Sequence, residues 1–359
     1  MVKMTQPTLY NRGVKLWVRF TLNGEVIKKS LNIEDNKVNR KLATTQIIPQ
    51  ILLKVHSGEF FENTTVPTVK DMITMSLSIN KSNRKYLTQR GYEMLLNRHV
   101  IPTFGKRKID TIKPSELALW QNKLLETMSS KSVTNARVIF HGIFEDALRD
   151  ELISKNPFSI VKSPKITATR EIKPFNKDEI FQILNNTKDK IKSFFAIGFF
   201  TGLRTGEITA LRYSDIDLEN RTITVSKTRN KGIETTPKTK SSNRVVEILD
   251  VLLPYIEEHI KNYKKSNDDY VFLTKFNKPY YSATKISVTY WQKVLKDLNL
   301  NHRTLYEMRH TFASMMISSG EDILWVSSTL GHKNANITLQ IYAKYIKSEK
   351  KSRGGFLLN

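Results

Sequence analysis

The sequence reads TGLRTGEITALR at residues 201–212. Gly202 and Gly206 bracket Arg204, and glycines at such positions allow the tight backbone turn from which a helix starts. The arrangement places a guanidinium at the beginning of a helix. Glu207 lies about one helical turn away, where it can form an ion pair with Arg204. Taken alone, the pair also fits an ordinary ion pair on a protein surface.

Two later stretches carry side chains of similar chemical interest. YEMRHTFASMM at residues 306–316 places Tyr306 and Arg309 three positions apart, and therefore on one helical face. LGHKNANITLQIYAKY at residues 330–345 places His332 after a glycine that marks a helix end, with Tyr342 ten positions further on. Singly, His332 fits a helix cap and Tyr342 an amphipathic helix residue. Each stretch gains weight only in combination with the others.

The charge balance favours a polyanionic partner. The chain has 359 residues, with 58 Lys and Arg against 34 Asp and Glu, so the formal net charge is +24. The basic excess is spread along the whole chain and is not confined to a tail, which suits a protein whose domains contact phosphate together. A generally basic surface that serves solubility is the simpler alternative. A membrane-surface protein is disfavoured, because no strongly amphipathic Lys/Arg helix is present.

Several classes of protein are excluded or disfavoured by what the sequence lacks. It has no cysteine, which excludes disulfides, thiolate zinc sites and cysteine nucleophiles. It has no long apolar stretch of membrane-spanning length and no apolar signal core at its start, so we expect a cytoplasmic protein. The phosphate-binding GxxxxGK[ST] loop, GxGxxG, HExxH and GxSxG are absent, so we expect no cofactor and no metal.

The first part of the chain predicts a small sheet and a helix. Val14–Ile33 alternates in character and is interrupted by Asn23-Gly24, the dipeptide that favours a hairpin turn. Asp35 is the expected N-cap of a helix that runs to about Val55 and is strained at Pro49. This module alone fits a structural sheet as well as a sheet that reads DNA.

The rest of the chain divides at polar segments. Helical patterns near 68–79, 82–98, 115–129 and 132–153 predict an all-helical domain, and residues 157–175 are rich in Pro, Lys and Ser. Beyond them, helices near 177–186 and 190–211 precede strands near 222–226 and 243–249, and five further helices follow up to residue 347. The predicted fold class is multidomain α+β, with a sheet-plus-helix domain at 1–62, a four-helix domain at 63–160, a linker at 161–175, a mainly helical domain with a small antiparallel sheet at 176–347 and a tail at 348–359.

The three stretches, in this order and in a basic chain, resemble the tyrosine recombinase (phage integrase) family. The resemblance covers about residues 173–347. It implies that the four-helix domain is a core-site DNA-binding domain and that residues 1–62 are an arm-site DNA-binding domain. The family cleaves and rejoins DNA at specific sites, and the resemblance implies a role in the integration and excision of a mobile element or phage.

The resemblance also implies roles for individual residues. Arg204 and Arg309 match the two arginines that bind the reacting phosphate, His332 the histidine that hydrogen-bonds it, and Tyr342 the nucleophile. The family's lysine, which protonates the leaving 5′-oxygen, is expected on a hairpin after the first arginine. The pattern KTxxSxR in TTPKTKSSNRVVEI places it at Lys238; Lys240 is a weaker choice, and Lys227 and Lys231 are weaker still.

One position departs from the family's pattern. Tyr306 stands three residues before Arg309, where the family usually has histidine. A phenol both donates and accepts hydrogen bonds, but its pKa near 10 makes it a poor base at neutral pH. Tyr306 is retained as a candidate site residue, and the general base is left open. His302 is out of register, and His310 fits a buried structural partner.

The expected chemistry is attack by tyrosine on a phosphodiester to give a 3′-phosphotyrosine, with two guanidinium groups neutralising the phosphate and with neither metal nor ATP. The expected partners are double-stranded DNA and three further copies of the chain in a tetramer that passes through a Holliday junction; a DNA-bending protein and an excisionase are further family partners. A non-catalytic DNA-binding regulator and a type IB topoisomerase are the alternatives.

Overall fold

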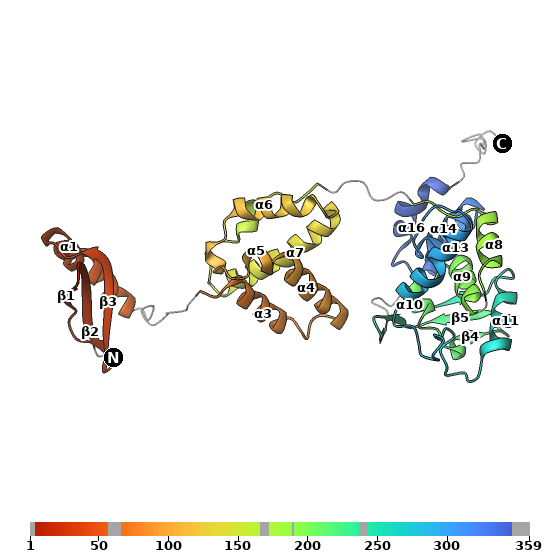
Figure 1. Cartoon of the computed structure of the whole chain (residues 1–359), viewed down its shortest axis with the longest axis horizontal. Coiled ribbons are helices and arrows are strands. Elements are labelled where there is room, and N and C mark those ends of the chain that lie inside the picture. Colours follow the sequence, from red (N-terminus) through yellow and green to blue (C-terminus); the bar gives the residue numbers. More distant parts are fainter. Residues whose placement is uncertain (1–3, 57–65, 166–171, 189, 237–242, 347–359) are drawn as a thin grey trace, which may run out of the picture. The chain divides into compact units, whose positions relative to one another are not determined.

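The computed structural model describes residues 4–56, 66–165, 172–188, 190–236 and 243–346. The chain divides into two compact units, Met1–Ala168 and Thr169–Asn359 (Figure 1). The predicted class, a multidomain and mostly helical protein with small antiparallel sheets near the N-terminus and in the last domain, is confirmed. Within the described ranges, no helix is long and apolar enough to cross a membrane.

The first unit begins with an antiparallel sheet of order β1-β2-β3. Its strands are β1 (Thr8–Arg12), β2 (Lys15–Leu22) and β3 (Glu25–Glu34). The predicted hairpin is β2–β3, and its turn residues Asn23 and Gly24 have φ angles of 50° and 94°, as a type I′ turn requires. The prediction missed β1, because five residues of mixed polarity carry too little alternation to indicate a strand.

A helical segment covers one face of this sheet. It consists of α1 (Lys37–Leu42), a π-helical turn (Ala43–Ile47) and α2 (Ile48–His56). The N-cap is Asn36, whose side chain accepts a hydrogen bond from the Asn39 amide at 2.8 Å, and not Asp35 as predicted. The π-helical turn ends at Ile47, two positions before Pro49, whose ring nitrogen cannot donate a helical hydrogen bond. Apolar side chains of α2 and of the alternate positions of β2 form the core of this module: Val18, Phe20, Leu22, Ile51 and Val55.

The helical part of the first unit has its own core. Its helices are α3 (Val69–Ile79), α4 (Tyr86–His99), α5 (Ile101–Phe104), α6 (Pro114–Leu125) and α7 (Ser130–Arg149). The four predicted helices are present, and α5 is a short addition. Aromatic side chains pack edge to face at the centre: Phe104, Trp120, Phe140, Phe144 and Phe158.

The second unit is mainly helical. Its helices are α8 (Lys177–Asn185), α9 (Lys190–Thr201), α10 (Thr205–Ile208), α11 (Leu253–Tyr263), α12 (Ala283–Ile286), α13 (Gln292–Asp297), α14 (Glu307–Ser318), α15 (Ile323–Leu330) and α16 (Ala335–Tyr342). Helix α9 is buried on nearly all sides and contacts α8, α11 and α14. It is the central helix around which the others pack.

Five short strands lie in the same unit. They are β4 (Ile216–Asp217), β5 (Thr222–Val225), β6 (Thr228–Asn230), β7 (Ile233–Thr235) and β8 (Arg244–Glu247). A three-stranded sheet has the order β4-β5-β8, and β6 and β7 form a separate hairpin. Figure 1 shows β4 and β5 on the side of the unit away from α14 and α16.

The predicted helix at 190–211 is interrupted. It ends at Thr201, and α10 begins only at Thr205. Gly202, with a φ of +64°, turns the chain out of α9. The apolar pattern continues across the break because Leu203, Ile208 and Leu211 remain buried, which explains why periodicity alone indicated one long helix.

Candidate active site and nucleic-acid surfaces

Arg204 lies in the turn between α9 and α10, at the N-cap of α10. Gly202 is required at this turn, because a Cβ there would lie 2.6 Å from a side chain of α14 and 2.7 Å from one of α15. Arg204 Nη1 donates to Glu207 Oε1 at 2.7 Å, and Nη2 donates to the Gly331 carbonyl at 3.4 Å. Its side chain is 36% exposed, so the guanidinium can also reach a ligand.

Glu207 is a buried carboxylate between two arginines. Arg244 Nη2 lies 2.9 Å from Glu207 Oε2, and Arg204 holds the other oxygen. Burial alone would raise the pKa of Glu207, but the hydrogen bond and charge of Arg244 and the charge of Arg204 bring this pKa below its ordinary value. Arg244 Nε also donates to the Thr329 carbonyl at 2.6 Å. Arg244 therefore connects the Arg204 turn to the end of α15.

Arg309 is the central buried cation of the site. It lies on α14 with only 2% of its surface exposed. Nη1 donates to the Gly202 carbonyl at 2.8 Å and Nη2 to the Leu330 carbonyl at 2.7 Å. Burial lowers its pKa to about 10, so it stays charged at neutral pH. One guanidinium thus holds together the Arg204 turn, α14 and the turn that leads to His332.

His332 follows the left-handed C-cap of α15, where Gly331 has a φ of +67°. Its Nδ1 lies 2.8 Å from Thr338 Oγ1. Burial and the nearby charges of Arg309 and Arg204 lower the pKa of His332 to about 4. The imidazole is therefore neutral at physiological pH and can donate a hydrogen bond through one ring nitrogen.

Tyr342 is the last residue of α16 and is only 1% exposed. Its Oη lies 2.6 Å from His310 Nδ1. Burial raises the pKa of Tyr342 above that of an ordinary phenol. Burial, together with the charge of Arg309, lowers the pKa of His310 to about 4. The phenol is therefore protonated and the imidazole neutral, so Tyr342 donates and His310 accepts.

Tyr345, the other tyrosine near the end of the described chain, has a different environment. Its Oη donates to the Ile172 carbonyl at 3.2 Å. Among the described residues, no contact of its hydroxyl with His310 is found. This placement supports Tyr342 over Tyr345 as the tyrosine of the site.

Tyr306 precedes α14 and is 42% exposed. Its ring meets His310 edge to face, with 5.0 Å between the centroids. Tyr306 and Arg204 both line a groove of about 510 Å³, whose other polar lining comes mainly from β6 and from the segment around α12. Tyr306, at the position where the chain departs from the family's pattern, therefore faces open space beside Arg204.

The structure describes two of the four lysines that are candidates for the proton donor. Lys238 and its weaker alternative Lys240 lie outside the described residues. Lys231 occupies the turn of the β6–β7 hairpin, with a φ of 50°. Lys227 lies directly before β6, and its Nζ is 3.6 Å from Glu234 Oε1. Of these four lysines, the described part of the chain thus places Lys231 in the hairpin turn and Lys227 directly before the first hairpin strand.

The N-terminal sheet presents a basic and aromatic face opposite its core. Tyr10 pairs with Trp17 across β1 and β2, and Arg19 pairs with Lys28 across β2 and β3. The Arg12 guanidinium lies 5.3 Å from the centroid of the Trp17 ring. Cations on a small, open sheet form a surface that suits contact with a nucleic-acid backbone.

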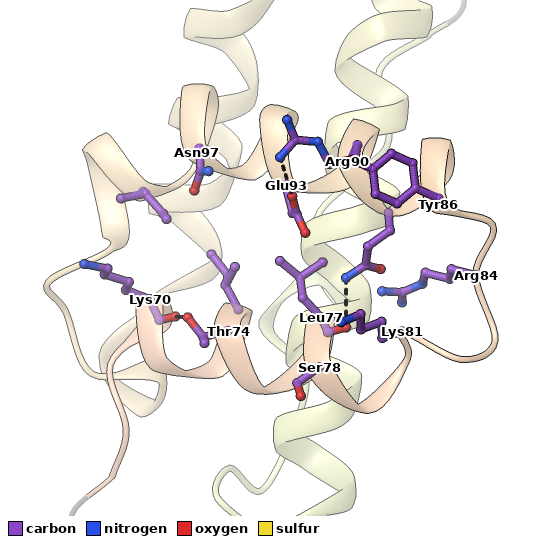
Figure 2. A pocket seen from close by; sticks show the side chains of 13 residues that line it. Lys70, Thr74, Leu77, Ser78, Lys81, Arg84, Tyr86, Arg90, Glu93 and Asn97 are labelled. Carbon is purple, nitrogen blue, oxygen red and sulfur yellow. Dashed lines mark hydrogen bonds and ion pairs between the residues drawn. The ribbon is translucent and has the colours of Figure 1, made fainter. Parts of the chain in front are cut away.

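The helical domain has a hollow of about 710 Å³ between α3 and α4. Figure 2 shows Lys70, Lys81, Arg84 and Arg90 around it, with Glu93 as the acidic neighbour of Arg90. The floor is apolar and includes Leu77. The rim carries more positive than negative charge, as expected for a surface close to phosphate.

No group of three or more metal-binding side chains is found in the described ranges. The described side chains of the site offer N–H donors, the phenol of Tyr342 and the imidazole of His310 as its acceptor.

The second unit matches the profile of the phage integrase family over residues 173–349, and residues 68–125 match the SAM-like N-terminal domain of phage integrases. The chain belongs to the phage integrase family of tyrosine recombinases.

Particular relatives are similar over most of their length. The chain is 29% identical to the ICEBs1 integrase of Bacillus subtilis over 303 residues, which cover 79% of this chain and 80% of the relative. It is 30% identical over 273 residues to a tyrosine recombinase XerC-like protein of Caldanaerobacter subterraneus, with 68% and 70% covered. Among solved structures, the Tn1549 transposon integrase in complex with transposon right-end DNA is 25% identical, with a TM-score of 0.67 and with 81% of this chain and 98% of that chain covered.

The sequence motifs predicted the candidate site residues, but they did not predict the side chains that contact and position them. Arg204, Arg309, His332 and the region of Tyr342 are brought together in the structure. His310 was interpreted as a structural partner, and its contact with Tyr342 could not be read from residues that lie 32 positions apart. Arg244 is the arginine of the KTxxSxR pattern, but nothing in that pattern indicates its contact with Glu207, 37 positions earlier.

Proposed function

We propose that this protein is a site-specific DNA recombinase that cleaves and rejoins strands through a 3′-phosphotyrosine, with Tyr342 as nucleophile. The observation that carries the proposal is the pair of hydrogen bonds from Arg309 to the carbonyls of Gly202 and Leu330. They hold Arg204, His332 and the His310–Tyr342 pair in one small region. A chain folded only for DNA binding has no need of such a convergence.

Arg204 and Arg309 are proposed to neutralise the phosphate. A guanidinium has five N–H donors, and charge that develops on the non-bridging oxygens in the transition state is stabilised most by donors fixed in advance. Arg204 is partly exposed toward the groove, and Glu207 fixes its orientation. The neutral His332 adds an N–H donor to the same oxygens. With these donors the reaction requires neither a metal ion nor ATP.

Tyr342 is proposed to attack phosphorus while its proton passes to His310 Nδ1. The low pKa of His310 describes the DNA-free site; a bound phosphate brings negative charge, which favours the protonated imidazole. Because the hydroxyl is buried in the DNA-free protein, attack also requires a movement of the end of α16 that exposes it. The phosphotyrosine retains the energy of the phosphodiester, so rejoining to a 5′-hydroxyl needs no added energy source.

The leaving 5′-oxygen needs a proton donor, and a lysine on or after the β6–β7 hairpin is proposed to supply it. Lys238 is the residue that the motif predicts. Lys227 lies on the same side of the hairpin as Glu234, next to the groove-lining strand β6. Tyr306, which lines the groove, is proposed to hydrogen-bond the phosphate or the attacking oxygen.

The remaining domains are proposed to hold DNA. Residues 1–62 would bind arm sites through the face that bears Trp17 and Arg19, and residues 63–160 would bind core sites, followed by the linker 161–175. The catalytic domain at 176–347 would act in a tetramer on two duplexes, with a tail at 348–359. The names of relatives, which include integrases of a transposon and of ICEBs1, support a mobile element as the substrate.

A nicked duplex tests the proposal. Candidate attachment sequences with a nick next to the cleavage position trap the covalent intermediate, because the short 5′-hydroxyl strand diffuses away. We expect a protein–DNA band that survives denaturation and disappears on protease treatment. A regulator without catalysis would form no such band on any duplex. A type IB topoisomerase would form it on duplexes without attachment sequences.

A further inference from the structure

Thr338 lies in the first turn of α16, and its side chain is fully buried. Asn334 caps this helix, and its side chain accepts a hydrogen bond from the Ile337 amide at 3.3 Å. Side chains of an α-helix tilt toward its N-terminus, so the Thr338 hydroxyl is directed back toward the residues that precede α16. His332 lies there, and its Nδ1 is 2.8 Å from Thr338 Oγ1.

The backbone of His332 is fixed independently of Thr338. Gly331 has a left-handed φ of +67°, and the His332 amide donates to the Ser327 carbonyl at 3.1 Å. These contacts belong to the C-cap of α15, so α15 determines where the imidazole begins. The hydroxyl from α16 then contacts one of the two ring nitrogens. Two helices therefore fix the ring between them.

The direction of the hydrogen bond between Thr338 and His332 follows from the other partners of the two groups. Burial and nearby charges lower the pKa of His332 to about 4, so at neutral pH one ring nitrogen carries a proton and the other a lone pair. Within the described residues, Thr338 Oγ1 has no second hydrogen-bond partner. If Nδ1–H donated to Oγ1, the buried hydroxyl proton would have no acceptor, which is unfavourable. The hydroxyl therefore donates to Nδ1, and the imidazole proton is on Nε2.

Nε2 is the open side of the His332 imidazole. It forms no hydrogen bond with the described residues and is not enclosed by them, so solvent or a ligand can reach it. Arg309 and Arg204 are close enough for their charges to lower the pKa of His332. An Nε2–H donor is thus available beside the two guanidinium groups that are proposed to bind the phosphate.

We infer that Thr338 is a positioning residue for His332, and that its hydroxyl selects the Nε2–H tautomer, in which the imidazole donates to a non-bridging oxygen of the reacting phosphate. The contact with phosphate rests on the proposed function. In the other tautomer, Nε2 would present a lone pair, which an anion repels.

The same helix carries the proposed nucleophile. Thr338 lies four residues before Tyr342, on one face of α16. This helix supplies a hydroxyl donor to each of two imidazoles, to His332 through Thr338 and to His310 through Tyr342. The movement that exposes Tyr342 needs to involve only the last turn of α16, so Thr338 can keep its contact during attack.

Nitrogen NMR of the DNA-free full chain tests the tautomer. The histidines are labelled with ¹⁵N, His332→Gln identifies the His332 signals, and couplings to the ring protons distinguish a protonated nitrogen from one with a lone pair. Near neutral pH we expect the Nε2–H tautomer in the wild type and in Thr338→Ser, which keeps the hydroxyl. Thr338→Val, which keeps the shape but removes the hydroxyl, should show a mixture of tautomers. A protonated Nδ1 in the wild type, or an unchanged Nε2–H tautomer in Thr338→Val, overturns the inference.

Thr329→Val is the matched control. Thr329 is also a buried threonine close to His332 in the chain, and its hydroxyl forms no hydrogen bond within the described residues. This variant should leave the His332 signals as they are in the wild type. A change equal to that in Thr338→Val would assign the effect to packing and would also overturn the inference.

Single-turnover cleavage of nicked duplexes tests whether Thr338 acts through His332. Thr338→Val should slow cleavage by about 10-fold, the effect of one neutral hydrogen bond, and Thr338→Ser should retain most of the wild-type rate. In a His332→Gln background, Thr338→Val should cause no further loss, because the ring that it positions is gone. A further loss of the same size in that background, or a Thr338→Ser variant as slow as Thr338→Val, contradicts the positioning role.

The two experiments separate this inference from the proposed function. If the tautomer depends on Thr338 as expected but the wild-type protein forms no covalent adduct on any nicked duplex, the proposed function fails and the positioning of His332 stands. If the wild-type protein forms the adduct but the tautomer does not depend on Thr338, the inference fails and the proposed function stands.

Discussion

His310 Nδ1 lies 2.6 Å from Tyr342 Oη, and the two side chains come from different helices, α14 and α16. His310 directly follows Arg309, which holds the carbonyls of Gly202 and Leu330. In the proposed mechanism, the helix that supplies the phosphate-binding arginine therefore also supplies the acceptor for the nucleophile's proton. Under this mechanism, we expect phosphate binding and activation of the tyrosine to be coupled through α14.

Replacing His310 by leucine should slow single-turnover cleavage by about 10²-fold, the usual contribution of one proton acceptor. The loss should shrink as pH rises from 7 to 9.5, because ionisation of the phenol by solvent then replaces the missing acceptor. His302→Leu is the control, because His302 is exposed and precedes α14. A His310→Leu variant whose rate equals that of the wild type would exclude the role.

The two low histidine pKa values predict how stability depends on pH. His310 and His332 have pKa values of about 4 in the folded protein and about 6.5 when unfolded. Between these values the unfolded chain binds more protons, so the free energy of unfolding should rise as pH increases from about 4 to 6.5. We expect about 1–2 kcal/mol from each imidazole after solvent screening.

Urea unfolding of the wild type and of His332→Gln across this pH range measures the effect. The variant should show a smaller slope of unfolding free energy against pH than the wild type. Equal slopes would mean that His332 titrates with the same pKa in the folded and unfolded states.

Variants of Arg204 and Arg309 should both slow cleavage but should differ in their effect on stability. Arg204→Ala should slow cleavage by about 10²–10³-fold with a smaller loss of stability than Arg309→Lys, because its side chain is partly exposed and Arg244 still pairs with the buried Glu207. Arg309→Lys should lose activity to a similar degree and also destabilise the second unit, because one ammonium cannot reproduce two fixed hydrogen bonds to separate carbonyls. Thermal unfolding beside cleavage separates the two effects. Near-normal cleavage by Arg309→Lys would contradict the proposed clamp.

Variants of Tyr306 test the role of the position at which the chain has tyrosine in place of the family's usual histidine. If its hydroxyl hydrogen-bonds the phosphate or the attacking oxygen, Tyr306→Phe should cost about 1–3 kcal/mol of transition-state stabilisation. Tyr306→His should be tolerated and should raise the rate near neutral pH, since imidazole readily accepts a proton there. Single-turnover rates across pH decide between this role and simple packing. A fully active Phe variant with an inactive His variant would remove Tyr306 from the site.

The sequence predicted the parts of the fold and site that depend on local patterns. Helix periodicity, the Asn23-Gly24 turn and the motif residues Arg204 and Arg309 each carry their signal within a few positions. The break at Gly202 was missed because buried residues continue on both sides of it. Periodicity reports burial, and it does not report the direction of the backbone.

The contacts that the sequence did not predict join segments that lie far apart in the chain. Arg244 reaches Glu207 across 37 positions, and Tyr270 reaches Glu234 across 36. Neither pair has a spacing that a helix or a hairpin would bring together, so no local rule indicates them. They become visible only when the strands and helices are packed.

The formation of a covalent adduct on nicked attachment-site DNA by paired tyrosine variants tests the central claim most directly. Tyr342→Phe should form no adduct while its affinity for DNA changes little, because one hydroxyl is lost from an interface dominated by phosphate contacts. Tyr345→Phe should form the adduct at the wild-type level, since its hydroxyl donates to the Ile172 carbonyl. An adduct formed by Tyr342→Phe, together with its loss in Tyr345→Phe, would contradict the assignment of the nucleophile.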